Sequence, residues 1–219
     1  MAEKPILHYF GGRGKSETIR LMLVAANVEF EHAPFITSAE EVAEYRKSGK
    51  TLFGQFPILE WNGKFMVQSM AIVRYIAHKY NLGGKDVEQA FTIDMLSEGT
   101  RDFLTPFISF RVLSDEQFKE QTEKACNKYL PIYEKVLEEN RAGFLVGESL
   151  SMADVCLLEV LVHVTDHYPE KLEGYPSLKG FLTRIRAQPN FANYFASDKA
   201  LPVSSQELIN TAFRALGFK

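Results

Sequence analysis

The strongest constraint on the fold of this chain is an abrupt change in its pattern at residues 81–86. Before this segment, short apolar runs alternate with helical periodicity. The runs at 5–10 and 28–36 predict two strands, and Asn62-Gly63 predicts a hairpin, because both turn positions tolerate a positive φ. Strands and helices in this order indicate a small α/β domain whose sheet has strands in both directions.

Helical signals dominate the rest of the chain. Segment 87–112 carries a long apolar stripe, within which Pro106 predicts a kink. Two capping boxes predict the starts of a second long helix and of a very apolar central helix, and their residues are Ser114 with Gln117 and Ser151 with Asp154. Shorter helices are predicted at 177–187 and 190–196, and a final amphipathic helix ends near Leu216. This part of the chain is therefore expected to be all-helical.

The predicted organisation is an α/β domain at 1–80, a linker at 81–86 and an all-helical domain at 87–219. The 219 residues are 46% hydrophobic and 24% charged, a composition typical of packed globular domains. A net charge of -3 offers no electrostatic attraction for nucleic acid or an anionic membrane, and no apolar run reaches the ~18 residues that span a bilayer. We expect a cytoplasmic protein with no nucleic-acid partner and no membrane insertion.

Metal and disulfide chemistry lack their ligands in this sequence. Cys126 and Cys156 form no C-x-x-C pair, so we expect both to pack as small hydrophobic side chains. The histidines show no spacing with acids or cysteines that is typical of a metal centre, and they are His8, His32, His78, His163 and His167. The sequence therefore predicts no metal cofactor.

The segment from Leu7 to Arg20 combines a glycine-rich turn with Gly-Lys-Ser at a predicted helix start. A Walker A loop would require glycine at position 9, where this chain has Tyr9. Tyr9 ends the first predicted strand, and the following helix start with Arg13 and Lys15 favours a bound anion. A phenol, with an ordinary pKa of about 10, keeps its proton and donates a hydrogen bond to a thiolate. Because no cysteine lies in this segment, such a thiol would come from a ligand.

Two further turns of the first domain are typical of ligand-binding loops. Pro57 opens a strand directly after a loop, where a cis proline leaves the preceding backbone free to pair with an extended ligand. Gln68 and Ser69 lie at a turn, with Ser69 predicted to cap a helix that runs to Tyr80, and helix starts bind carboxylates. Each turn alone is also consistent with ordinary packing, but three such turns in one small domain favour a ligand site.

These features, taken together, resemble the cytosolic glutathione transferases, and the chain looks most like the alpha class. The resemblance rests on "LHYFGGRGKSETIRLMLVAANVEFE", "FGQFPILEWNGKFMVQSMAIVRYIAHKYNLGGKD" and "YLPIYEKVLEENRAGFLVGESLSMADV", and it runs over essentially the whole chain. It implies two domains, a thioredoxin-like N-terminal α/β domain with a mixed sheet and an all-α C-terminal domain, in each subunit of a homodimer. The implied activity is detoxification by conjugation of glutathione, the co-substrate, to small hydrophobic electrophiles. Hydroperoxide reduction and steroid isomerisation would use the same thiolate.

The resemblance also implies roles for individual residues. Tyr9 would stabilise the glutathione thiolate, assisted by Lys15, where the alpha class usually has an arginine. The residues implied to contact or support glutathione are Arg13, Arg46, Gln55, Phe56, Pro57, Gln68, Ser69, Asp102 and Lys128. Of these, Arg13 would be structural, and Asp102 would reach the glutathione of the other subunit. The implied electrophile pocket comprises Phe10, Gly12, Phe107, Ile108, Val112, Phe213 and Leu216. Phe53 would be an aromatic key that inserts into the neighbouring subunit.

Two alternative functions remain open on the same scaffold. The sigma class of these transferases includes prostaglandin D synthases and is the nearest enzymatic alternative. A hydrophobic ligand carrier or a lens crystallin would be a non-catalytic alternative. A crystallin is expected to have lost the turns of the site or to have gained a large insertion between helices, and the sequence shows neither change.

Overall fold

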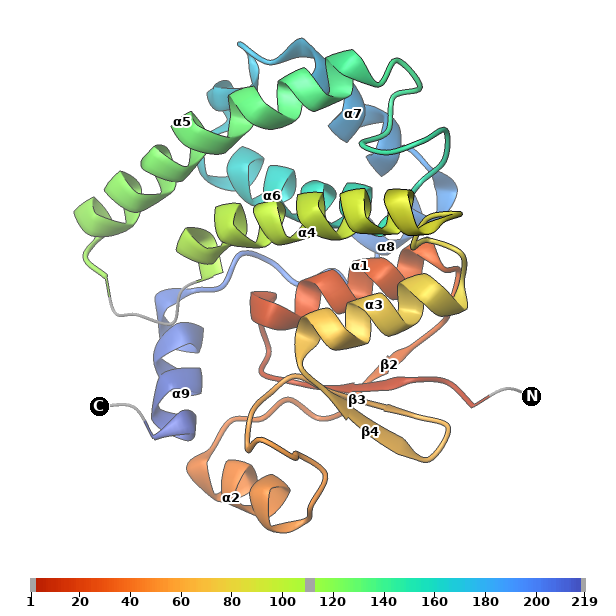
Figure 1. The fold of residues 1–219 in the computed structure, drawn as a ribbon. Coiled ribbons are helices and arrows are strands. Elements are labelled where there is room, and N and C mark those ends of the chain that lie inside the picture. Colours follow the sequence, from red (N-terminus) through yellow and green to blue (C-terminus); the bar gives the residue numbers. More distant parts are fainter. Residues whose placement is uncertain (1–2, 109–112, 218–219) are drawn as a thin grey trace.

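The computed structural model describes residues 3–108 and 113–217, which form stacked layers of sheet and helices (Figure 1). Within these residues, a four-stranded sheet has the order β2-β1-β3-β4. Strand β1 (Ile6–His8) runs parallel to β2 (Glu31–His32) and antiparallel to β3 (Ile58–Trp61). The mixed strand directions that the sequence predicts are confirmed.

Strand β2 is shorter than the predicted run at 28–36. Backbone pairing with the chain at and directly after β1 continues beyond β2. The N–H groups of Ala33 and Ile36, which follow β2, donate to carbonyls of that part of the chain at 3.1 Å. Pro34 lies between these two residues and has no N–H group. The regular ladder therefore ends after two residues.

The hairpin between β3 and β4 (Lys64–Val67) turns at the predicted residues. Asn62 and Gly63 have φ values of 50° and 70°, the left-handed conformation that a two-residue hairpin turn requires. The following turn differs from its prediction, because Gln68, with a φ of 69°, occupies the N-cap position of the next helix and makes no side-chain capping hydrogen bond there. Ser69 is instead the first helical residue, so its backbone N–H is among those without an intrahelical partner.

Helices lie on both sides of the sheet. Helix α1 (Glu17–Ala25) follows the short 3-10 turn η1 (Gly14–Ser16), and α3 (Ser69–Lys79) packs beside it between the sheet and the later helices (Figure 1). Helix α2 (Ala39–Lys47) lies beyond the sheet, next to the C-terminal helix (Figure 1). From the sequence, either a loop or a helix was possible between the second strand and the hairpin. The structure has a helix there, and Ser38 and Glu41 form a capping box at its start.

The helical part of the chain follows residues 81–86. It comprises α4 (Val87–Ile108), α5 (Asp115–Glu139), α6 (Met152–His167), η2 (Pro169–Leu172), α7 (Pro176–Arg186), α8 (Pro189–Phe195) and α9 (Gln206–Leu216). Both predicted capping boxes are present, and Ser205 caps α9 by accepting the Leu208 N–H at 3.2 Å. Pro106 lies inside α4. The prediction of a helical second part is confirmed, and the domain boundaries stay a prediction.

Helix α6 is the central helix of the molecule, since its residues 152–164 are all buried. Asp154 stabilises its start, because the carboxylate accepts bonds from the Ser151 N–H at 2.8 Å, the Ser151 hydroxyl at 2.7 Å and the Leu145 N–H at 2.8 Å. Burial nevertheless raises the pKa of Asp154 to about 6. One apolar cluster runs from Leu7 in the sheet to Phe191 in α8, so both parts of the chain share a continuous core.

The two cysteines are buried and unpaired, as the sequence predicts. Burial raises the pKa of Cys126 to about 11 and that of Cys156 to about 12, so neither thiol is an effective nucleophile at neutral pH. In the described part of the chain, no helix is long and apolar enough to cross a membrane. The same residues contain no cluster of three or more His, Cys, Asp or Glu side chains placed to hold a metal ion.

Candidate active site

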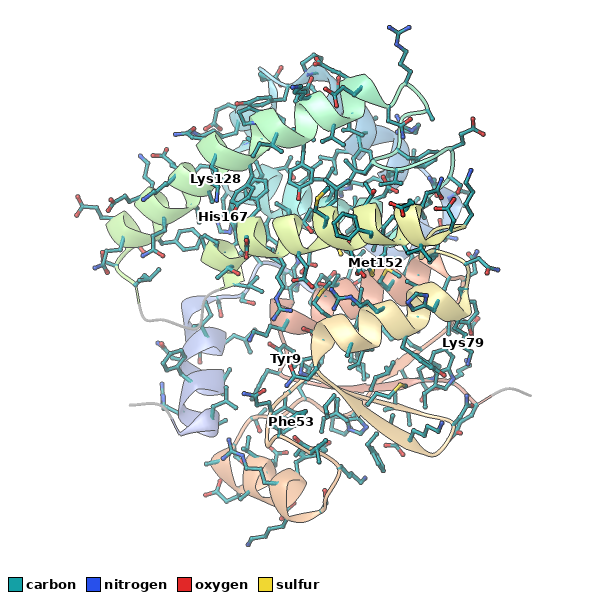
Figure 2. All side chains as sticks on the ribbon, viewed as in Figure 1. Tyr9, Phe53, Lys79, Lys128, Met152 and His167 are labelled. Carbon is teal, nitrogen blue, oxygen red and sulfur yellow. The ribbon has the colours of Figure 1, made fainter. Side chains whose placement is uncertain are left out.

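Tyr9 follows β1 directly and lies at the centre of the molecule (Figure 2). Its hydroxyl oxygen accepts a hydrogen bond from the Lys15 backbone N–H at 3.1 Å. Gly14 is required in this turn, because its φ is 39° and a Cβ there would lie 2.5 Å from the tyrosine hydroxyl. Burial raises the pKa of Tyr9 to about 12. The phenol therefore keeps its proton at neutral pH and can donate it in a hydrogen bond to an anion.

A cavity of about 520 Å³, which we call the tyrosine cavity, opens beside Tyr9. It is lined by Tyr9, Phe10, Lys15, Arg46, Phe53, Gly54, Gln55, Phe56, Gln68, Ser69, Arg101 and Leu216. Among these described lining residues, three carry a positive charge and none carries a negative charge. The tyrosine cavity therefore favours an anionic ligand.

A second cavity, of about 480 Å³, adjoins the first between α1, α3, α4 and α6, and we call it the inner cavity. Lys15, Ser69 and Arg101 line both cavities and so mark the junction between them. Helix α4 forms much of its wall, and α9 contributes Phe213. A ligand in the inner cavity can therefore meet a ligand in the tyrosine cavity at Lys15.

Two loops shape the tyrosine cavity. The Gln68 side-chain amide donates to the side-chain oxygen of Gln55 at 3.1 Å, which joins the two ends of the β3–β4 hairpin. Arg46 Nε donates to the Gly54 carbonyl at 3.2 Å and holds the same loop against α2. The peptide bond before Pro57 is cis, the conformation considered for this position from the sequence. These loops and the start of α3 present backbone amides beside cations, an arrangement that suits an extended ligand with carboxylates.

Both parts of the chain match known family models. Residues 5–78 match the glutathione S-transferase N-terminal domain, and residues 101–198 match the glutathione S-transferase C-terminal domain. The chain is also 42% identical over 221 residues to Glutathione S-transferase 3 of Gallus gallus, covering 99% of this chain and 96% of the relative. This chain belongs to the glutathione S-transferase family.

Further relatives support the class and the fold of this transferase. Glutathione S-transferase alpha-1 of Rattus norvegicus is 37% identical over 214 residues, which cover 95% of this chain and 96% of the relative. The structure of monomeric Na-GST-3, a glutathione s-transferase from the hookworm Necator americanus, has a TM-score of 0.78 at 27% identity, covering 93% of this chain and 100% of that chain. The predicted family, its resemblance to the alpha class and the two-domain glutathione transferase fold are confirmed.

Most residues expected to act on glutathione come together at one site. The expected catalytic pair and five expected binding residues line the tyrosine cavity, and they are Tyr9, Lys15, Arg46, Gln55, Phe56, Gln68 and Ser69. Pro57 is buried next to Phe56 and does not line the cavity. The structure therefore groups these residues around one space, while their individual roles stay predictions.

Arg13 does not line either cavity of the transferase. Its Nε donates to the Leu201 carbonyl at 2.7 Å, and its Nη1 pairs with Asp166 of α6. The side chain thus supports the turn from behind, which fits a structural arginine and not a direct glutathione contact. Arg20, which is fully buried, assists by donating to the Gly12 carbonyl at 3.3 Å.

Asp102 and Lys128 also lie outside the two cavities. Both are exposed, on α4 and α5, and Lys128 lies well away from Tyr9 (Figure 2). The Lys128 amine donates to the hydroxyl of the adjacent Tyr129 at 2.8 Å. The expected role of Asp102 requires a second subunit, so it stays a prediction.

The expected electrophile residues divide between the two cavities. Phe10 and Leu216 line the tyrosine cavity, and Ile108 and Phe213 line the inner cavity. Val112 lies outside the described residues. The expected electrophile pocket therefore extends over both cavities.

Gly12 and Phe107 do not line either cavity. A Cβ on Gly12 would lie 2.7 Å from the Ser204 hydroxyl oxygen, so the segment before α9 covers this position. Phe107 packs into the helical core, where its ring lies 5.9 Å from that of His163. Phe107 follows the cavity residue Leu104 by three positions, so helical spacing does not separate the two. The packing of α4 against α6 is what turns the Phe107 side chain to the core.

The sequence prediction missed several cavity residues. On α4 these are Ser97, Thr100, Arg101, Leu104 and Thr105, and elsewhere they are Thr18, Met70, Cys156 and Glu159. The α4 set could have been found, since Leu104 and Arg101 precede Ile108 by about one and two helical turns. Glu159 also carried a signal, as a charged residue inside the most apolar helix of the chain.

Proposed function

We propose that this transferase binds glutathione in the tyrosine cavity, holds its sulfur as a thiolate beside Tyr9 and adds it to a hydrophobic electrophile in the inner cavity. The observation that carries the proposal is that Tyr9, whose raised pKa keeps its proton at neutral pH, lines a cavity with three cationic side chains. The family membership supplies the co-substrate. Conjugation of this kind would serve detoxification in the cytoplasm.

Glutathione carries two carboxylates at opposite ends, and the cavity offers a partner for each. The γ-glutamyl carboxylate would bind at Ser69, where the start of α3 presents backbone amides. The glycyl carboxylate would lie near Arg46 on α2. The cysteinyl unit would pair with the backbone at Phe56, between these ends. This pose places the sulfur toward Tyr9.

Thiolate formation requires a modest free energy. Lowering a thiol pKa from about 8.5 to about 6.5 requires the protein to stabilise the thiolate over the thiol by about 2.7 kcal/mol. A charge-assisted hydrogen bond from Tyr9 and the nearby Lys15 cation together supply an effect of this size. The thiol proton is released to solvent, and the Tyr9 proton stays on its oxygen throughout.

The chemical step is nucleophilic attack by the bound sulfur. The sulfur lone pair forms a bond to the electrophilic carbon, and a leaving group departs with the bonding electron pair. In an addition to a double bond, the electron pair instead remains on the substrate and takes a proton from solvent. The same thiolate would serve hydroperoxide reduction or double-bond isomerisation. The protein accelerates the step by raising the thiolate fraction and by holding both reactants together.

A homodimer completes this proposal. Phe53 is 59% exposed and its neighbour Leu52 is 78% exposed, an apolar pair on an otherwise polar loop. Such side chains suit burial by a partner subunit. In a dimer, Asp102 would reach the γ-glutamyl amine bound to the other subunit, and Lys128 would lie close to Asp102.

The test is an ultraviolet titration of bound glutathione, following thiolate absorbance against pH. We expect an apparent thiol pKa well below that of free glutathione, and we expect Tyr9→Phe to lose most of that shift and much of the rate of chlorodinitrobenzene conjugation. Tyr75→Phe is the matched control, because Tyr75 is 41% exposed on α3 and lines neither cavity. An unshifted pKa in the native protein would exclude the proposed mechanism.

A further inference from the structure

Arg101 connects the two cavities from the helical side of the molecule. Helix α4 is separated from the sheet by α1 and α3 (Figure 1). Among the residues of α4, all of which lie in the described part of the chain, only Arg101 lines the tyrosine cavity. Arg101 also lines the inner cavity, on the same face of α4 as Ser97, four positions before it, and Leu104, three positions after it. The long side chain of Arg101 therefore lies where the two cavities join.

The charge of Arg101 is not neutralised by the acidic residues that precede it on α4. Glu98, about one turn earlier, pairs with Arg74 of α3, and Asp94 pairs with the same arginine at 2.7 Å. Among the described residues, none forms a salt bridge or a hydrogen bond with the Arg101 side chain. A guanidinium is charged at neutral pH and presents five N–H donors in one plane. Arg101 is therefore available to an anionic ligand at the junction.

The proposed pose of glutathione leaves Arg101 without an anion. The two carboxylates of glutathione are assigned to the helix start at Ser69 and to Arg46, and its thiolate is assigned to Tyr9 and Lys15. Arg101 belongs instead to α4, which forms much of the wall of the inner cavity. The cation that glutathione does not use therefore lies on the side of the junction where the electrophile would bind.

We infer that Arg101 is a specificity-determining residue that favours electrophiles carrying a carboxylate close to the reactive carbon. A guanidinium binds a carboxylate through two parallel charge-assisted hydrogen bonds, which are stronger than bonds between neutral groups. A neutral electrophile leaves the guanidinium in water and gains nothing from it. The apolar part of such an electrophile would pack against Leu104, Ile108 and Phe213, which line the inner cavity.

The inference rests on the proposed function, and its test uses a matched pair of substrates. Chloronitrobenzoate and chloronitrobenzamide, with the chlorine para to the carboxylate or amide and ortho to the nitro group, have nearly the same shape, but only the benzoate is an anion. In both, the glutathione sulfur forms a bond to the ring carbon that carries chlorine, and chloride leaves with the bonding electron pair. The measured quantity is kcat/KM for the benzoate relative to the benzamide. Each value is divided by the uncatalysed rate constant with glutathione, so that intrinsic reactivity cancels.

The informative variant is Arg101→Gln, which removes the charge and keeps a polar side chain. Arg101 is exposed, so the variant is expected to fold. Arg101→Lys is the conservative variant, because it keeps the charge and loses only the planar fork of donors. Arg141→Gln is the matched control, since it removes the same charge from an exposed position that lines neither cavity.

We expect the ratio of benzoate to benzamide to fall about three- to tenfold in Arg101→Gln, to fall less in Arg101→Lys and to stay within about twofold in Arg141→Gln. An unchanged ratio in Arg101→Gln would overturn the inference. If the KM for glutathione were raised in that same variant, Arg101 would belong to the binding of the co-substrate instead.

Unreactive probes separate this inference from the proposed function. Nitrobenzoate and nitrobenzamide lack the chlorine and cannot be conjugated, and calorimetry with excess S-methylglutathione gives their dissociation constants. A weaker preference for nitrobenzoate in Arg101→Gln than in the native protein would support the role of Arg101 even without any conjugation. Equal preferences in the two proteins would overturn it. Failure of the native protein to conjugate chlorodinitrobenzene would contradict the proposed function alone.

Discussion

The guanidinium of Arg13, in the turn after Tyr9, pairs with the carboxylate of Asp166 at the end of α6. The same side chain donates to the Leu201 carbonyl, in the segment that leads to α9. One arginine therefore connects the turn after Tyr9, the central helix and the segment before the C-terminal helix. The position of Tyr9 depends through this contact on packing far along the chain.

Arg13→Gln should destabilise the fold. The side chain of Arg13 is only 13% exposed, so its loss leaves Asp166 and the Leu201 carbonyl without a partly buried partner. We expect a loss of about 1–3 kcal/mol in the free energy of unfolding, measured by urea denaturation. A double-mutant cycle with Asp166→Asn isolates the pair, and strictly additive effects of the two substitutions would contradict the coupling.

Gly14→Ala should impair catalysis without preventing folding. The new methyl group would lie within 2.5 Å of the Tyr9 hydroxyl oxygen, and the φ of 39° is unfavourable for alanine. Displacing a catalytic group by about 1 Å costs on the order of a hundredfold in rate, so we expect at least a tenfold loss of conjugation rate. Gly174→Ala is the control, because nothing lies within 4 Å of a Cβ at that position. Equal rates in the two variants would show that Tyr9 is not held by this turn.

The stability of the protein should depend on the titration of Glu159. Its pKa is about 8 in the folded state, against an ordinary value of 4.5. Between pH 4.5 and about pH 8, the folded chain therefore keeps a proton on Glu159 that the unfolded chain releases. The stability that this proton contributes is fully present at lower pH and is lost as pH rises through this window, at up to about 1.4 kcal/mol per pH unit. Glu159→Gln cannot titrate, so its free energy of unfolding should fall less steeply from about pH 5 to about pH 8. Parallel urea-denaturation profiles for the two proteins would contradict the assignment.

Phe53→Ser should weaken the proposed dimer. An aromatic side chain buried by a partner contributes about 2 kcal/mol or more in many interfaces, so we expect at least a tenfold rise in the dissociation constant, measured by sedimentation. Val203→Ser, at a 40% exposed position before α9, is the control. Phe53 also lines the tyrosine cavity. A related hookworm structure, Na-GST-3, is that of a monomeric transferase. If the native protein also sediments as a monomer, the dimer role of Phe53 is contradicted and its role is confined to the tyrosine cavity.

Much of the local structure could be predicted from the sequence by itself. The Asn62-Gly63 turn and the boxes at Ser114 and Ser151 are short-range features, in which a few consecutive residues satisfy each other's hydrogen bonds. The family resemblance identified the residues around Tyr9 for the same reason, because their motifs lie in continuous segments. Between the second strand and the hairpin the sequence left a loop or a helix open, although the capping box at the start of α2 favours the helix.

The cavities and their chemistry were decided only by the tertiary structure. Whether Phe107 faces the ligand or the core depends on how α4 packs against α6, and periodicity alone does not say which stripe faces which neighbour. The bond between Thr18 and Glu159 joins residues 141 positions apart. The raised pKa of Glu159 follows from its burial in α6 against α1. Local hydrogen bonding specifies the elements, but burial and the meeting of distant side chains arise only when those elements pack together.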